Sequence, residues 1–182
     1  MTTKNDQIAK ILEVDPRDQN AVLAGLAQTA IIPLKVAKIR LPVVASATAQ
    51  DTGFDLPTKG VVLDAWLDVR TFEATGGTKT VDLGLLAGES GGDVDGFIDG
   101  LSVATSAGIK QPVLTKSAET VGLLLKYTIT DNGSATHPQR QWHVLNGTAK
   151  SVVYVLGSDD FAELVCDAVI VYMDFTQLLG SS

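Results

Sequence analysis

The residues best suited to chemistry in this sequence are four carboxylates within the glycine-rich stretch 84–108, namely Glu89, Asp93, Asp95 and Asp99. Calcium takes about six to eight oxygen ligands, and Asp-x-Asp-Gly is a fragment of many calcium loops. The full EF-hand spacing is missing, so the alternative is that these are turn carboxylates, with Asp93 or Asp95 capping a short helix. We expect no bound metal or other cofactor, and Asp93, Asp95 and Asp99 stay as weak metal candidates.

Other catalytic patterns are absent or incomplete. The two histidines, His137 and His143, have no third zinc ligand close to them in sequence. There is no Gly-x-Ser-x-Gly nucleophile elbow, no phosphate-binding loop and no dinucleotide fingerprint. The single cysteine, Cys166, follows Val165 beside an apolar run and is expected to be a small core residue. The sequence therefore predicts no catalytic residues and no enzyme.

Four aromatic side chains are candidates for a binding surface: Trp66, Phe72, Trp142 and Tyr154. Such a surface would suit a sugar or a protein partner, whereas packing against a second layer is the alternative. Trp66 stands out because its neighbours on the same strand face are charged. A tryptophan among aspartate and arginine is better explained by an interface than by exposure to solvent, so we predict Trp66 to be an interface residue.

Alternating hydrophobicity indicates the strands that must position these residues. The clearest strand, 61–72, is expected to turn its odd-numbered residues from Val61 to Val69 toward the core. Pro33 and Pro42 bracket residues 34–41, which favours an edge strand, and a slip at Ala37/Lys38 predicts a bulge there. Further strands are expected at 81–85 and 121–129, with a turn at Asn132-Gly133 after the latter.

The last third of the chain continues this β pattern. Residues 141–145 and 151–156 flank Asn146-Gly147, which predicts a hairpin. Residues 168–175 are apolar on both faces, as in a central strand. Short strands without alternating long helices predict a mainly β chain, a β-sandwich or jelly roll, as a domain over residues 33–182.

A helical arm is expected to precede this domain over residues 1–32. Asp15-Pro16 is typical of a helix start, and the leader carries two short amphipathic segments, each too short to be stable alone. The arm caps the domain's own core or binds a neighbouring subunit. Its predicted interface residues are Ile8, Ile11, Leu12, Val22, Leu23 and Leu26.

Length, charge and composition limit the function classes. The chain has 182 residues, 45% of them hydrophobic and 19% charged, which fits one folded domain. A net charge of −7 argues against nucleic-acid binding, because phosphate contacts need clustered lysine and arginine. No apolar run is long enough for a membrane span, and the polar start predicts no cleaved signal peptide. One cysteine excludes an internal disulfide.

Three segments carry a family resemblance: 60–69 (GVVLDAWLDV), 80–86 (TVDLGLL) and 91–103 (GGDVDGFIDGLSV). In this progression the chain resembles virion structural proteins of tailed bacteriophages, of the head decoration, cement or fibre-base type, over about residues 55–175. The resemblance implies a β-sandwich that binds the outside of a capsid, often as a trimer, without catalysis. It identifies no individual binding residues.

Two functions from different classes follow. The first is a capsid decoration (cement) protein that binds the major capsid protein on the shell exterior as a homo-oligomer, most simply a trimer, after assembly in the bacterial cytoplasm. The second is a carbohydrate- or receptor-binding β module of a fibre or tail. An acidic chain suits the exterior of a DNA-filled shell better than its interior, which favours the first.

Overall fold

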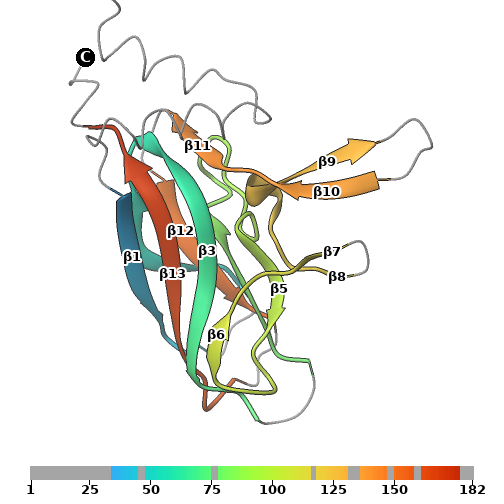
Figure 1. The fold of residues 1–182 in the computed structure, drawn as a ribbon. Coiled ribbons are helices and arrows are strands. Elements are labelled where there is room, and N and C mark those ends of the chain that lie inside the picture. Colours follow the sequence, from blue (N-terminus) through green and yellow to red (C-terminus); the bar gives the residue numbers. More distant parts are fainter. Residues whose placement is uncertain are drawn as a thin grey trace, which may run out of the picture.

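The chain folds mainly into β-strands, arranged as two facing sheets with two small hairpins beside them (Figure 1). The structure is a computed structural model, and it describes residues 34–44, 48–74, 78–115, 118–130, 136–146, 150–157 and 161–176. The predicted helical arm, with all six of its interface residues, lies outside the described residues, and so does the turn at Asn132-Gly133.

Sheet A has five strands. β13 (Val165–Asp174) lies between the edge strand β1 (Leu34–Leu41) and β3 (Lys59–Thr71). The other side of β3 pairs with β11 (His143–Asn146) near its start and with β6 (Gly108–Lys110) near its end. All these pairings are antiparallel.

Sheet B has four antiparallel strands in the order β2–β12–β4–β5. They are β2 (Gln50–Leu56), β12 (Lys150–Leu156), β4 (Thr80–Leu85) and β5 (Ile98–Ser102). The chain passes from β1 in sheet A to β2 in sheet B, back to β3, and on to β4 and β5. It later crosses from β11 to β12 and returns to β13, so the first and last strands described are paired.

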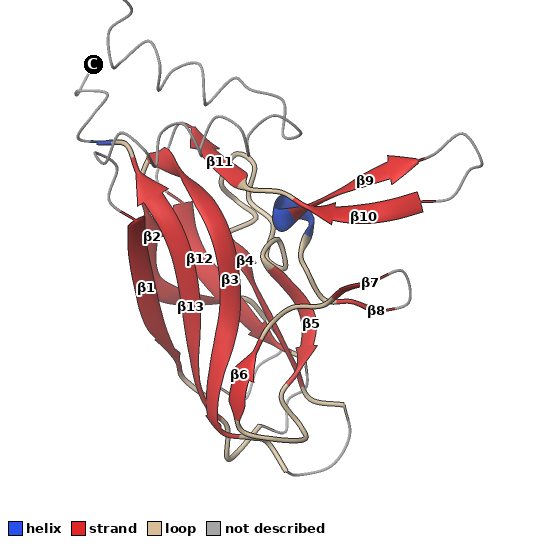
Figure 2. Ribbon diagram, in the orientation of Figure 1, coloured by secondary structure: helices blue, strands red, loops and turns tan. Residues whose placement is uncertain are grey.

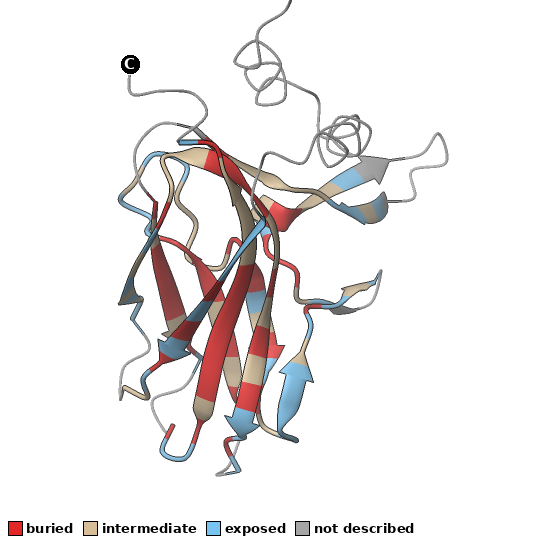
Figure 3. Ribbon diagram, turned by 60° about the vertical axis from the view of Figure 1, so that its left-hand side comes forward, coloured by how far each residue is buried: buried red, intermediate tan, exposed pale blue. Residues whose placement is uncertain are grey.

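One hydrophobic core fills the space between the sheets, as the burial pattern shows (Figure 3). Sheet A contributes Ile39, Leu67 and Ile170, and sheet B contributes Leu83 and Tyr154, all of them buried. Burying such side chains from two sheets against each other is what makes a sandwich stable.

Two small hairpins project from the side of the sandwich (Figure 2). One pairs β7 (Leu114–Thr115) with β8 (Ala118–Glu119), and the other pairs β9 (Lys126–Thr130) with β10 (Thr136–Arg140). A single 3₁₀ turn, η1 (Leu123–Leu125), precedes β9. Among the described residues no helix has the length and apolar character needed to cross a membrane.

The predicted alternation along β3 is wrong at its start. A bulge places Val171 opposite Asp64 and Tyr172 opposite Val62, so that Leu63 is the extra residue. Val62 therefore joins the core with Ala65, whereas Val61 packs on the outer side with Leu63. The predicted bulge at Ala37/Lys38 is also wrong, because β1 pairs with β13 in continuous register. Val36 simply points outward and is exposed.

Three further expectations are corrected. Residues 141–145 and 151–156 do not form a hairpin, because β11 pairs with β3 and β12 pairs with β2 and β4, in the opposite sheet. Only the end of 121–129 is a strand, since η1 interrupts it and leaves Leu123 exposed. No helix follows Asp95, because residues from Ile98 form β5. The edge strand β1 and the central strand β13 are confirmed.

Candidate interaction surface

The outer face of sheet A carries the most distinctive arrangement of side chains in the described chain. Ile39 on β1, Leu67 on β3 and Ala168 on β13 face the core. Because side chains alternate along a strand, the residues next to each of them face outward. Register then builds cross-strand rows, of which one joins Arg40, Asp167, Asp68 and Ile109. The next row joins Lys38, Val169 and Trp66.

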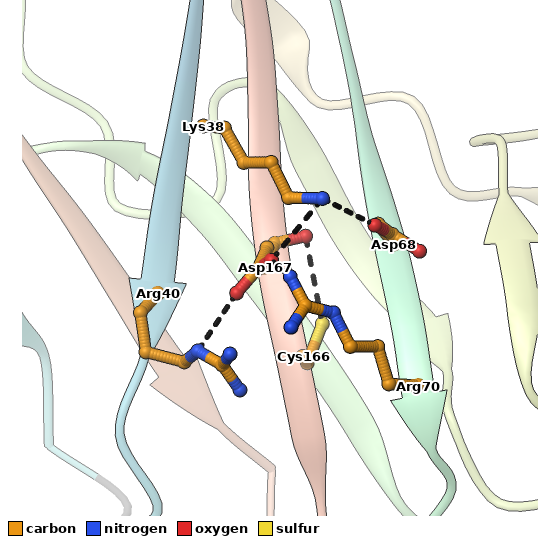
Figure 4. Close-up of polar contacts among 6 residues, drawn as sticks. All are labelled: Lys38, Arg40, Asp68, Arg70, Cys166 and Asp167. Atoms are coloured by element: carbon orange, nitrogen blue, oxygen red, sulfur yellow. Dashed lines mark hydrogen bonds and ion pairs between the residues drawn. The ribbon is translucent and has the colours of Figure 1, made fainter.

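Five of these outward side chains form what we call the basic cluster: Lys38, Arg40, Asp68, Arg70 and Asp167 (Figure 4). Asp167 is its centre, with a side chain only 4% exposed. Its carboxylate accepts from Arg40 Nε at 2.8 Å, from Arg70, and from Lys38 Nζ at 3.3 Å. Lys38 Nζ also lies 2.6 Å from Asp68 Oδ2.

Charge is not balanced within the basic cluster, since three cations face two carboxylates. The hydrogen bond from Lys38 lowers the pKa of Asp68, so that this carboxylate stays ionised. The side chains of Arg40 and Arg70 are each 49% exposed, although a buried carboxylate holds them. The arrangement therefore presents two guanidinium groups in fixed positions to solvent or to a partner.

Trp66 and Ile109 lie beside this cluster. Trp66 is half-buried on the outer face of sheet A, opposite Val169 in the register. Ile109 is 59% exposed and lies opposite Asp68. Leu34 and Val36, at the start of β1, are exposed on the same sheet face. Trp66, predicted to be an interface residue, thus lies between charged and apolar side chains on a broad sheet surface.

The carboxylates of stretch 84–108 lie elsewhere, in the connection between β4 and β5 and at the start of β5. Asp93 shares a side-chain hydrogen bond with Asp95, which together with partial burial raises the pKa of Asp93 to about 6. Asp99 is exposed at the start of β5. No group of three or more His, Cys, Asp or Glu side chains in the described part of the chain is arranged to hold a metal ion.

Much of the motif that carries the phage resemblance serves the scaffold. The backbone N–H of Gly100 donates to Asp82 Oδ1 at 2.6 Å, which ties β5 to β4. A Cβ on Gly84 would lie 2.0 Å from the carbonyl oxygen of Asp93, so only glycine lets the connection pack against β4. Glu89 accepts from the backbone N–H of Ser151 at 2.9 Å. Asp82, Gly84 and Glu89 are therefore structural residues.

The histidines and the cysteine are not brought together. His137 lies on β10 in a projecting hairpin, whereas His143 lies on β11 in sheet A. Burial, with a smaller contribution from the charge of Lys150, lowers the pKa of His143 to about 4. Cys166 is fully buried in the core, where desolvation raises the pKa of its thiol to about 12. A thiol in this setting is a poor nucleophile.

The four aromatic candidates do not share one surface. Tyr154 is buried in the core and donates its hydroxyl to the carbonyl oxygen of Pro42 at 2.6 Å. Trp142 packs with Val61 and Phe175 in a small second cluster. Trp66 and Trp142 are both partly exposed in the described chain, and Phe72 is 36% exposed.

Sequence reasoning missed the basic cluster. Its members come from three strands far apart in the chain, and nothing local marks Asp167 as the carboxylate that holds Arg40 and Arg70. The available clue was the alternation itself, which puts Lys38 and Arg40 on one face of a strand and Asp68 and Arg70 on one face of another.

No family model matches the sequence, and no curated protein matches it. Two solved structures are similar in fold. A chain of the cyanophage Pam1 capsid asymmetric unit has 13% identity and a TM-score of 0.49, covering 79% of this chain and 86% of that chain. A chain of the acid-stable capsid structure of Helicobacter pylori bacteriophage KHP30 has 11% identity and a TM-score of 0.44, covering 77% and 86%.

Proposed function

We propose that this protein is a non-enzymatic decoration (cement) protein, which binds the major capsid protein on the outside of a tailed-phage shell and stabilises it. The observation that carries the proposal is the order of the strands. From the orders β1–β13–β3–β11 and β2–β12–β4–β5, with the crossings between them, we infer a jelly roll. Jelly rolls recur in viral capsid proteins and in lectins.

The side chains favour the capsid role over a sugar-binding role. A lectin needs an aromatic platform with nearby polar groups, but Tyr154 is buried in the core and Trp142 is partly buried against the apolar Val61 and Phe175. The outer face of sheet A instead offers charged and apolar side chains over several strands, which suits contact with another protein. The resemblance of segments 60–69, 80–86 and 91–103 to phage virion proteins points the same way.

The leader, residues 1–32, is proposed as the attachment arm. Its two amphipathic segments need a partner to fold, and the sandwich has its own core from Ala37 onward. The arm joins the sandwich at β1, where Leu34 and Val36 are 58% and 61% exposed. We propose that the arm binds the shell or an adjacent copy in a homotrimer on the capsid exterior.

Co-sedimentation with empty shells that lack the native protein tests this function. The full chain should sediment with the shells and raise their melting temperature. The variant Ile11→Asp with Leu23→Asp should lose most binding, whereas Asn5→Asp with Gln19→Asp, which adds the same charge at polar positions, should bind as the full chain does. Undiminished binding by the first variant would exclude the arm as the segment that attaches the protein to the shell.

A second measurement separates the two functional classes. The full chain should give no specific binding on a glycan array at concentrations that saturate the shells. Glycan binding without shell binding would overturn the decoration role and favour the fibre or tail module.

A further inference from the structure

Two surfaces of opposite charge occur on this chain, and each lacks compensation within the part of the chain that the structure describes. The basic cluster on sheet A has one more cation than carboxylate. The connection between β4 and β5 carries Asp93 and Asp95, and Asp99 follows at the start of β5; no described lysine or arginine forms an ion pair with these three carboxylates. We call residues 86–99, which are this connection and the first two residues of β5, the acidic loop.

The guanidinium groups of the basic cluster are ready to bind a carboxylate. Among the described residues each is bonded through one nitrogen to Asp167, by Nε for Arg40 and by an Nη for Arg70. An arginine has five N–H donors, so most of these donors have no described partner, on side chains that are 49% exposed. Asp167 has already fixed both groups, so binding a partner costs little further ordering.

The carboxylates of the acidic loop repel one another. The shared hydrogen bond between Asp93 and Asp95, which goes with the raised pKa of Asp93, indicates that they lie too close to be ionised together at low cost. Asp99 and Asp95 also act on Asp82, where burial is the main cause of a raised pKa. A cation brought by a partner would relieve this repulsion.

One copy of the chain cannot join these two surfaces. The basic cluster lies on the face of sheet A that points away from sheet B. The acidic loop packs on β4 of sheet B, where Leu85 donates its N–H to the carbonyl oxygen of Asp93 at 2.7 Å. A contact between them must therefore come from a second copy.

We propose that the basic cluster, with Trp66 and Ile109 beside it, binds the acidic loop of a second copy of this chain. The two patches differ, so the contact is heterologous, and it closes into a ring when the rotation between copies allows. Trp66 and Ile109 supply apolar area around the charges, a composition that is common at the centre of interfaces. The inference rests on the homo-oligomer of the proposed function and assigns its contact faces.

Sedimentation equilibrium on the full chain and charge-reversed variants tests the contact. Asp95→Lys with Asp99→Lys should weaken association by about tenfold or more. Arg40→Glu with Arg70→Glu should do the same, and all four substitutions in one chain should restore association. Asp51→Lys with Asp55→Lys, two exposed positions on β2, changes the net charge equally and should have no such effect.

Circular dichroism and a thermal melt establish the fold of each variant. Should the arginine reversals prevent folding, the milder Arg40→Gln and the acidic-loop variant decide the question alone. An acidic-loop variant that associates as tightly as the wild type would overturn the proposal, and so would a wild-type chain that is monomeric at 100 µM. A monomer that still binds shells would contradict the contact between copies but not the decoration function. A salt-sensitive oligomer that binds no shell would support the contact and contradict the decoration function.

Discussion

Replacing Gly84 by alanine is expected to destabilise the sandwich strongly. The new Cβ would lie 2.0 Å from the carbonyl oxygen of Asp93 and 2.6 Å from the backbone nitrogen of Gly96. An ordinary contact begins near 3.4 Å, so the acidic loop must withdraw by about 1.4 Å. This movement breaks two backbone hydrogen bonds, Leu85 N–H to Asp93 O at 2.7 Å and Phe97 N–H to Leu83 O at 2.9 Å.

The broken hydrogen bonds and the steric clash together determine how far the free energy of unfolding falls. Two lost hydrogen bonds remove about 1 to 3 kcal/mol, and overpacking adds about 1 to 3 kcal/mol. The free energy of unfolding should thus fall by about 2 to 6 kcal/mol, which lowers the melting temperature by on the order of 10 °C. Scanning calorimetry measures the change. Gly88→Ala is the matched control, since nothing lies within 4 Å of its Cβ position, and it should change stability by less than about 1 kcal/mol. Equal melting temperatures for the two variants would refute the packing argument.

Two further predictions concern titratable groups. Because the pKa of Asp93 is raised to about 6, the folded state holds its proton more tightly than the unfolded state, so the free energy of unfolding should fall as the pH rises from about 4 to 6. Denaturant titrations across this pH range should show that the free energy of unfolding falls less steeply with pH in Asp93→Asn than in the wild type or Asp55→Asn. Equal slopes in the three proteins would contradict the prediction. Cys166, whose pKa burial raises to about 12, should not react with a thiol reagent at pH 8 until denaturant unfolds the chain; rapid reaction of the native protein would count against this burial.

The sequence predicted the positions of individual strands better than it predicted which strands pair with each other. The apolar run 168–175 marks a central strand, and β13 does lie between β1 and β3. The hairpin expected around Asn146-Gly147 is wrong because β11 and β12 belong to opposite sheets. A local turn preference is worth less than the burial that each strand gains in its own sheet, and that burial depends on residues about 80 positions away.

The bulge in β3 could not be predicted from the sequence for the same reason, that it depends on a distant strand. Residues 61–63 are all apolar, so alternation cannot tell which of them faces the core. The structure decides it by packing Val61 with Phe175 on the outer side and Val62 with the core. Pairing with β13, rather than any property of β3 alone, fixes where the register shifts.

The motif that carries the phage resemblance separates into two sets of positions with different tasks. Gly84 and Gly92 have no room for a Cβ, since each would meet a backbone oxygen within about 2 Å. Gly84 lets the acidic loop pack against β4, and Gly92 lets the loop turn back on its own residue Leu86. The loop's contacts with β4 and η1 use its backbone, and the Asp95 side chain bonds to Asp93 within the loop. Folding should therefore restrict these glycines more than the carboxylates of Asp95 and Asp99, so charge reversal at the two carboxylates is aimed at association, and the thermal melt of the variant shows that the fold is kept.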